Sequence, residues 1–242
     1  MKNEFSLKDK SVLITGAAGG IGEATARVCA ELGASLVLAD LVEPLELASE
    51  LKASGTIVET YGFDVTDRMA TERIIEGLDR LDAVVVNAGF CPWDDWSDDG
   101  WDDVFNRVID VNLQGVLHLT RACLPRMCES GSGNIVLVSS VAGRMGGLKA
   151  SPHYVAAKGG VNALVKWMAR KAAPYGVVVN AVAPGATATG MTTGQSFNAD
   201  AIPLQRLAEP REIALPISFL CSSAASYICG TTLDVNGGVF MN

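Results

Sequence analysis

The sequence predicts an α/β fold with a doubly wound parallel sheet of about seven strands and helices on both faces. Short, fully apolar segments alternate with segments of helical periodicity along the chain. This alternation is typical of parallel strands that crossover helices cover on both sides. A glycine-rich turn joins the first apolar segment to the first helical one. No linker of distinct composition and no internal repeat divides the 242 residues, so we expect one domain over residues 1–242.

Each expected strand is an apolar run between turn signals. The first, residues 12–14, leads into the glycine turn, after which apolar residues recur at helical spacing as far as Gly33. Further helical patterns cover residues 45–51 and 66–78. The other expected strands lie at residues 36–39, 57–61, 83–86, 135–138, 177–180 and 232–235.

The composition indicates a soluble protein that acts on small molecules. No apolar stretch is long enough to span a bilayer, and residues 1–10 lack the apolar run of a secretory signal. We therefore expect a cytoplasmic location. A formal net charge of −8 repels phosphate backbones and anionic membrane surfaces, so neither nucleic acid nor a membrane is an expected partner.

The cysteines and histidines do not predict a metal site. The six cysteines form no Cys-x-x-Cys pair, and only His118 and His153 supply imidazole. We expect most of the thiols to be reduced and buried as small apolar side chains.

Residues 15–22, Thr-Gly-Ala-Ala-Gly-Gly-Ile-Gly, predict a dinucleotide site. Glycines let the backbone approach a pyrophosphate closely, and free amides at a helix N-terminus attract anions. Ala18 replaces the second glycine of the common Gly-x-Gly-x-x-Gly pattern. About twenty residues further on, Asp40 ends the second strand, where a carboxylate accepts hydrogen bonds from ribose hydroxyls and repels a 2′-phosphate. The sequence therefore predicts NAD rather than NADP.

Tyr154 and Lys158 are four residues apart in a segment with helical character, so both side chains project from one face. A phenol titrates near pH ~10 in water, and a neighbouring ammonium lowers the pKa of the phenol by stabilising the phenolate. Such a tyrosine acts as a general base toward an alcohol or as a general acid toward a ketone.

The order of these motifs resembles the short-chain dehydrogenase/reductase family over essentially the whole chain. Between the glycine turn and the Tyr154–Lys158 pair lie Asn112 and the pair Ser139-Ser140, and a Pro-Gly turn follows the sixth strand. The resemblance implies a single-domain Rossmann fold for dinucleotide binding and catalysis. It also implies an NAD-dependent oxidoreductase that moves a hydride between nicotinamide and a secondary alcohol or ketone, and a homotetramer.

The resemblance implies a catalytic tetrad of Asn112, Ser140, Tyr154 and Lys158. In the family the serine holds the substrate oxygen, the tyrosine exchanges the proton, the lysine also binds the nicotinamide ribose, and the asparagine helps hold a water. The interval from Ser140 to Tyr154 is one residue longer than usual in the family, so either Ser139 or Ser140 is a candidate. We choose Ser140 because its spacing to the tyrosine is closer to that of the family.

The cofactor-binding residues that the resemblance implies lie at the glycine turn and after the later strands. Gly20 stands where many members that use NADP carry arginine, which also favours NAD. The implied residues are Thr15, Gly16, Gly20, Ile21, Gly22, Asp40, Asp64, Val65, Asn87, Ala88, Gly89, Tyr154, Lys158, Pro184, Gly185, Thr187 and Thr189.

An apolar substrate pocket is expected above the strand ends, and it favours a hydrophobic or aromatic secondary alcohol. Trp93 is either an aromatic wall of this pocket or a core residue, and His153 either touches substrate or lies on the surface at a helix start. The acidic segment 94–103 is interpreted as a solvated loop and the first turn of a helix. The expected lining residues are Cys91, Trp93, Ser140, Met145, Gly146, Leu148, His153 and Met191.

Two other functions stay open. One is a 3-oxoacyl-carrier-protein reductase using NADPH or NADH, because the end of the chain looks similar to those enzymes. This function ranks second, because Asp40 favours NAD and those enzymes generally use NADPH. The other is a non-catalytic NAD-binding sensor or structural subunit, against which the intact tetrad argues. An epimerase or dehydratase is disfavoured because the chain has no room for an added substrate domain.

Overall fold

The expected strands form one parallel sheet in the computed structural model, which describes residues 3–147 and 149–242. Within these residues the sheet has seven strands in the order β3-β2-β1-β4-β5-β6-β7, and every neighbouring pair is parallel. The predicted doubly wound sheet is therefore confirmed. The strands are β1 (Ser11–Thr15), β2 (Ser35–Asp40), β3 (Val58–Gly62), β4 (Ala83–Val86), β5 (Gly133–Val138), β6 (Val177–Pro184) and β7 (Thr232–Val235).

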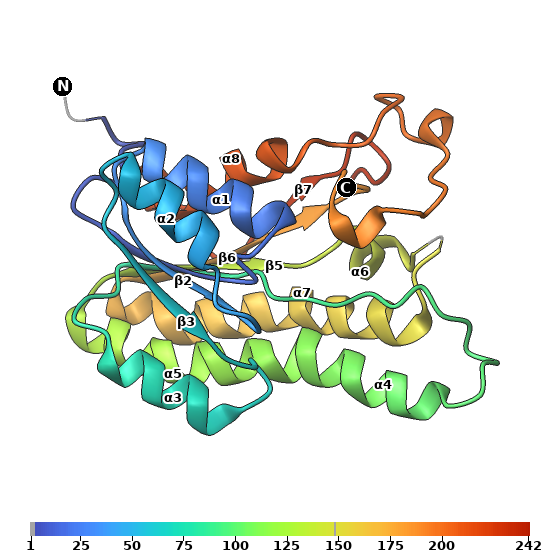
Figure 1. The fold of residues 1–242 in the computed structure, drawn as a ribbon, viewed down its shortest axis with the longest axis horizontal. Coiled ribbons are helices and arrows are strands. Elements are labelled where there is room, and N and C mark those ends of the chain that lie inside the picture. Colours follow the sequence, from blue (N-terminus) through green and yellow to red (C-terminus); the bar gives the residue numbers. More distant parts are fainter. Residues whose placement is uncertain (1–2, 148) are drawn as a thin grey trace.

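Helices cover both faces of the sheet. The described helices are α1 (Gly20–Glu31), α2 (Leu45–Ala53), α3 (Arg68–Gly77), α4 (Trp101–Ile109), α5 (Gly115–Ser130), α6 (Ala142–Met145), α7 (Pro152–Ala172) and α8 (Pro210–Cys221). Figure 1 shows α1, α2 and α8 on one face and α3, α5 and α7 on the other. In the described part of the chain, no helix is long and apolar enough to cross a bilayer.

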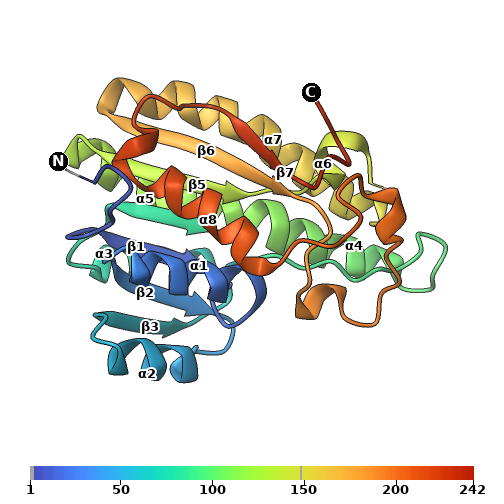
Figure 2. The ribbon, with the colours of Figure 1, turned by 90° about the horizontal axis from the view of Figure 1, so that it is seen from above.

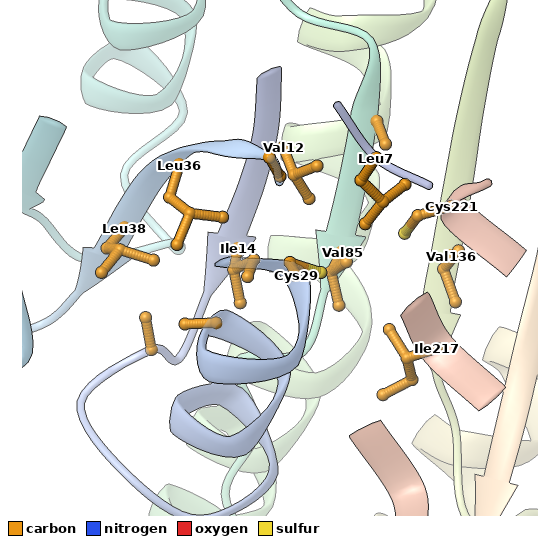
Figure 3. Packing of buried hydrophobic residues seen from close by; sticks show 14 of the residues in the cluster. Leu7, Val12, Ile14, Cys29, Leu36, Leu38, Val85, Val136, Ile217 and Cys221 are labelled. Carbon is orange, nitrogen blue, oxygen red and sulfur yellow. The ribbon is translucent and has the colours of Figure 1, made fainter. Parts of the chain in front are cut away.

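The apolar strands explain why both faces must be covered. All five residues of β1 are buried, and successive side chains point to opposite faces. Val12 and Ile14 pack with Cys29 of α1 and Ile217 of α8 (Figure 3). Leu13, between them in sequence, belongs to the core on the opposite face. Full burial of one such side chain stabilises the fold by about 1.5–3 kcal/mol.

The strand order indicates the edge of the sheet at which a ligand site is expected. Because β2 and β4 lie on opposite sides of β1, the connections after β1 and after β4 diverge at the carboxyl ends of the strands (Figure 2). A crevice at such a switch point is where open α/β sheets bind ligands. The glycine turn follows β1, and residues 87–89 follow β4, so both segments meet at this crevice.

The helical segment that carries Asn112 is not a regular α-helix. Between α4 and α5 the chain forms a π-helical turn, Asp110–Gln114, and Asn112 lies at its centre. Such single wide turns are rare and occur frequently at functional sites. The periodicity of apolar residues does not predict such a turn. A single π turn changes only the rotation of the following residues around the helix axis.

Candidate active site

The glycine turn packs directly on the segment that follows β4. Gly16 has a φ of +68°, and a Cβ at this position would lie 2.8 Å from Asn87 Nδ2 and 2.9 Å from Ala88 Cα. Asn87 Nδ2 donates to the carbonyl oxygens of Thr15 and Gly16 at 3.1 and 3.0 Å. A Cβ at Gly22 would lie 1.9 Å from the carbonyl oxygen of Gly16. The turn therefore forms a cradle that side chains would fill.

Thr15 and Gly22 shape this turn from below and do not line the cavity above it. Thr15 is buried, and its Oγ1 accepts hydrogen bonds from the backbone amides of Asn87 and Ala88. Thr15 and Gly22, both expected to contact the cofactor, thus lie on the core side of the turn, where Asn87 packs against them.

A cavity of about 740 Å³ opens above the glycine turn. Its position over the glycine turn and the N-terminus of α1 fits a dinucleotide, because amides at a helix N-terminus attract phosphate and glycines let it approach the backbone. The structure brings most of the expected cofactor residues to this cavity: Gly16, Gly20, Ile21, Asp40, Asp64, Val65, Asn87, Ala88, Gly89 and Thr189.

The Asp40 carboxylate is held at the edge of this cavity by backbone amides. Its Oδ2 accepts from Ala18 N at 2.8 Å, and its Oδ1 accepts from Leu41 N at 2.7 Å. Among the described residues that line the cavity, Arg107 is the only cation, and its guanidinium packs 5.0 Å from the centroid of the Phe90 ring. A fixed carboxylate at this end suits ribose hydroxyls and disfavours a phosphate.

Tyr154 and Lys158 lie on α7 and face a second cavity of about 280 Å³. The two side chains are one turn apart, and Lys158 Nζ lies 5.7 Å from the centroid of the Tyr154 ring. Lys158 is buried, and its Nζ donates to the carbonyl oxygen of Val138 at 2.9 Å. The ammonium is thereby anchored to the end of β5 and directed to the same site as the phenol.

The two serines at the end of β5 have different roles. Ser139 Oγ donates to the carbonyl oxygen of Lys158 at 3.1 Å and ties β5 to α7. Ser140 Oγ accepts from Ala142 N at 3.1 Å, and Ser140 acts on the Tyr154 phenol by lowering its pKa. Ser140 is therefore the hydroxyl directed at the phenol, as the family spacing predicts.

Burial dominates the electrostatics of the pair. It raises the pKa of Tyr154 well above its ordinary value, against the lowering effect of the Ser140 hydrogen bond. Burial also lowers the pKa of Lys158 to about 8. The expectation that the ammonium lowers the pKa of the phenol is not met here, because loss of hydration disfavours both charged forms. Tyr154 holds its proton at neutral pH.

Asn112 braces the turn after β4 beside the lysine. Its Nδ2 donates to the carbonyl oxygens of Phe90 and Val108 at 2.7 and 3.0 Å, and its Oδ1 accepts from Phe90 N at 3.2 Å. A Cβ at Gly89 would lie 3.0 Å from Asn112 Oδ1 and 3.4 Å from Lys158 Nζ. Asn112 is fully buried and lines neither cavity, so it acts on the site through the position of Gly89.

The two cavities meet where β1, β4 and β6 end. Ile21, Asn87, Gly89, Thr189 and Met191 line both of them. Of the other expected nicotinamide contacts after β6, the structure places Pro184, Gly185 and Thr187 in the wall of the smaller cavity. The junction is thus bordered by residues expected to hold the nicotinamide, next to Tyr154 and Lys158.

Trp93 forms a wall of the smaller cavity, as one of the two interpretations of this residue predicts. Its Nε1 donates to the carbonyl oxygen of Met191 at 2.9 Å, and its ring meets that of Phe197 edge-on at 5.6 Å. Trp93 adopts a φ of +59°, a conformation that costs a non-glycine residue about 1–3 kcal/mol and is concentrated at functional sites. Cys91, Ser140, Met145 and Met191, which were also expected in the lining, line this cavity as well.

Lining residues that the sequence analysis did not name include Lys149, Phe197, Ile202 and Val239. Phe197 is the one aromatic residue between positions 191 and 203, which is a signal that sequence reasoning can use. Val239 reaches the site from the C-terminal segment, and no local pattern indicates that approach.

Two expected substrate contacts lie elsewhere. Gly146 does not line the cavity. His153 is 1% exposed, does not line the cavity and instead contacts Asp94, Trp101 and Phe105, so it is neither a substrate contact nor a surface residue. Leu148 lies outside the described residues. Burial raises the pKa of the Cys91 thiol to about 11, so this thiol is protonated at neutral pH.

Comparison with known proteins agrees with this geometry. Residues 16–240 match the family model described as enoyl-(acyl carrier protein) reductase. The chain is 35% identical to L-rhamnose 1-dehydrogenase (NAD(P)(+)) of Azotobacter vinelandii, over 98% of both chains. It is 38% identical to cis-4-hydroxycyclohexanecarboxylate dehydrogenase of Sinomonas cyclohexanicum, over 95% of this chain and 96% of the relative.

A solved structure shows the same fold. It is that of a 3-oxoacyl-[acyl-carrier protein] reductase from Brucella melitensis with bound NAD. The two structures superimpose with a TM-score of 0.91 at 36% identity, over 99% of this chain and 94% of the other.

Proposed function

Because the chain belongs to the short-chain dehydrogenase/reductase family, we propose that it transfers a hydride between NAD and a secondary alcohol or its ketone. The observation that carries the proposal is the junction of the two cavities beside Tyr154 and Lys158. When bound, the nicotinamide supplies the hydride acceptor or donor. The side chains of this protein hold the substrate oxygen and move its proton.

Three side chains perform these tasks. The Ser140 hydroxyl holds the substrate oxygen next to the phenol. Tyr154, protonated at neutral pH because burial raises its pKa, donates the proton to a ketone oxygen. In the opposite direction the phenolate form of Tyr154 takes the proton of an alcohol, and the Lys158 ammonium stabilises the negative charge of that phenolate before the transfer.

The proposed cofactor is NAD, although relatives include an enzyme named for use of either NAD or NADP. Support comes from the Asp40 carboxylate, which two backbone amides hold at the edge of the larger cavity. A 2′-phosphate placed there would meet a fixed negative charge.

The proposed substrate is a secondary alcohol on an apolar, ring-sized skeleton that carries a carboxylate. Trp93, Met145 and Phe197 supply apolar walls, and no carboxylate lines the smaller cavity among the described residues. Lys149 lines its rim, with Nζ hydrogen-bonded to the carbonyl oxygen of Ser196 and 5.3 Å from the centroid of the Phe197 ring. An ammonium beside an aromatic wall suits an anionic group. The name of the Sinomonas relative describes such a ring acid.

The activity is tested by mixing the protein with NAD and a panel of alcohols and following NADH absorbance. The panel contains 4-hydroxycyclohexanecarboxylate, cyclohexanol and L-rhamnose, and the ketone direction is assayed with the corresponding ketones and a 3-oxoacyl thioester, using NADH and NADPH. We expect turnover of the ring alcohols. Turnover confined to 3-oxoacyl thioesters would favour the reductase alternative, and no turnover in either direction with either cofactor would contradict the proposal.

Replacement of Lys149 by methionine is expected to raise KM for the hydroxy acid about tenfold, because a hydrogen bond to a charged group contributes about 1.5–3 kcal/mol. KM for cyclohexanol should not change. Lys166→Met, which removes an exposed charge on α7, is the matched control. Equal KM values for the hydroxy acid in Lys149→Met and in the control would contradict the proposed carboxylate contact.

A further inference from the structure

Asp94 is the exception in the acidic segment 94–103, which the sequence indicates to be solvated. Most of that segment is exposed, and Trp96 is 73% exposed. The Asp94 side chain is only 13% exposed. Its Oδ1 accepts from Ser151 Oγ at 2.5 Å, and its Oδ2 lies 3.0 Å from His153 Nε2. Asp94 thus contacts two residues at the start of α7.

The contacts of the His153 ring define its tautomer. Nδ1 lies 2.7 Å from the backbone nitrogen of Tyr154, which is a donor, so Nδ1 is the acceptor. Nε2 then carries the hydrogen and donates to the Asp94 carboxylate. Both ring nitrogens are satisfied in the neutral form.

His153 takes over the role that the N-cap residue usually has. The first amides of a helix have no acceptor within the helix. Ser151 is the N-cap of α7, but its hydroxyl does not cap the helix and instead donates to Asp94. Among the hydrogen bonds of the described residues, the Tyr154 amide has the His153 ring as its acceptor. The ring therefore caps the amide of the residue that carries the phenol.

Aromatic packing holds this ring in place. The Trp101 ring, in the first turn of α4, stacks on the His153 ring with centroids 5.3 Å apart and an interplanar angle of 7°. Phe105 packs at 6.2 Å from the same ring. The imidazole is thus enclosed between α4, the Asp94 segment and α7. The same loop carries Cys91 and Trp93 into the smaller cavity.

We infer that His153 is a positioning residue: oriented by Asp94 and Trp101, it caps the Tyr154 amide and sets the place of the phenol relative to Ser140 and Lys158. This inference rests on the proposed function. A shift of about 1 Å in a catalytic group can lower the rate by about a hundredfold, so a defined first turn of α7 matters more for kcat than for binding of the cofactor.

Three substitutions separate the two bonds of the ring. His153→Ala removes both. His153→Asn keeps an acceptor at the place of Nδ1, and His153→Gln keeps a donor near the place of Nε2.

We expect His153→Ala to lower kcat per cofactor site about 10- to 100-fold, with KM for NAD within about twofold of the wild-type value. We expect Asn to restore kcat to within about threefold, and Gln to behave like Ala. Asp99→Ala, in the exposed part of the same loop, is the control and should leave kcat unchanged.

Wild-type kcat per site in His153→Ala, or failure of Asn to restore it, would overturn the inference. If His153→Ala does not fold, Asp94→Ala replaces it, and an unchanged kcat per site has the same meaning.

A measurement without turnover separates this inference from the proposed function. Nitrogen-15 NMR of the histidine ring should show the neutral tautomer with hydrogen on Nε2, and amide exchange at Tyr154 should be faster in His153→Gln than in His153→Asn. A protein that turns over no substrate but shows both signatures would contradict only the proposed reaction. The opposite tautomer, or equal exchange in the two variants, would contradict the positioning role.

Discussion

Replacement of Tyr154 by phenylalanine is expected to lower kcat for alcohol oxidation about a thousandfold or more, without loss of NAD binding. The substitution removes the one hydroxyl that exchanges a proton with the substrate oxygen, and general acid–base catalysis contributes about 10²–10⁴-fold. The ring itself stays, so the packing of α7 is retained. The measurement is steady-state kcat together with NAD affinity by fluorescence titration.

The pH dependence of the same reaction serves as the control for this assignment. Because the pKa of Tyr154 is raised, the phenolate fraction increases with pH across the neutral range, and alcohol oxidation should become faster as the pH rises. Ketone reduction needs the protonated phenol, which predominates throughout the neutral range, so its rate should stay nearly constant there. The rise in oxidation should flatten above pH 8, because Lys158, with a pKa of about 8, loses the charge that stabilises the phenolate. A Tyr154→Phe variant that keeps wild-type kcat, or wild-type oxidation that slows between about pH 6 and pH 8, would be incompatible with the role of Tyr154.

Replacement of Asp40 by alanine is expected to raise KM for NAD about 10- to 100-fold. The carboxylate is expected to accept hydrogen bonds from ribose hydroxyls, and the loss of one hydrogen bond to a charged group costs about 1.5–3 kcal/mol, which corresponds to about this factor. Discrimination against NADP should fall by a similar factor, because the fixed negative charge is removed. The measurement is kcat/KM for both cofactors with one alcohol.

Asp40→Asn separates charge from hydrogen bonding. The amide keeps the shape of the side chain and one acceptor for the backbone amides of Ala18 and Leu41. We expect this variant to retain more of the NAD affinity than alanine does, yet to accept NADP better than the wild type. Equal kcat/KM for NAD and NADP in the unaltered protein would show that Asp40 does not select the cofactor.

Most of the fold could be predicted because its signals are local. Each expected strand is an apolar run such as Ala83–Val86, and all of β4 is indeed buried. The glycine turn and the Tyr154–Lys158 spacing are local as well, since both depend on residues within one turn or one helix. The corrections concern residues whose role depends on packing between distant segments. Thr15 lies below the glycine turn because Asn87, 72 residues further along, covers it.

By itself, the sequence determined the order of strands and helices along the chain, and it predicted the glycine turn and the residues proposed to carry the chemistry. Periodicity and short motifs encode these features, because backbone geometry and helix periodicity act over a few residues. Only the tertiary structure decided which groups are dehydrated and which distant side chains meet. Burial raised the pKa of Tyr154 where the neighbouring lysine alone would lower it. Likewise, an acidic loop that sequence indicates to be solvated delivers Asp94 to His153, 59 residues away, because the two helices that flank this contact pack together.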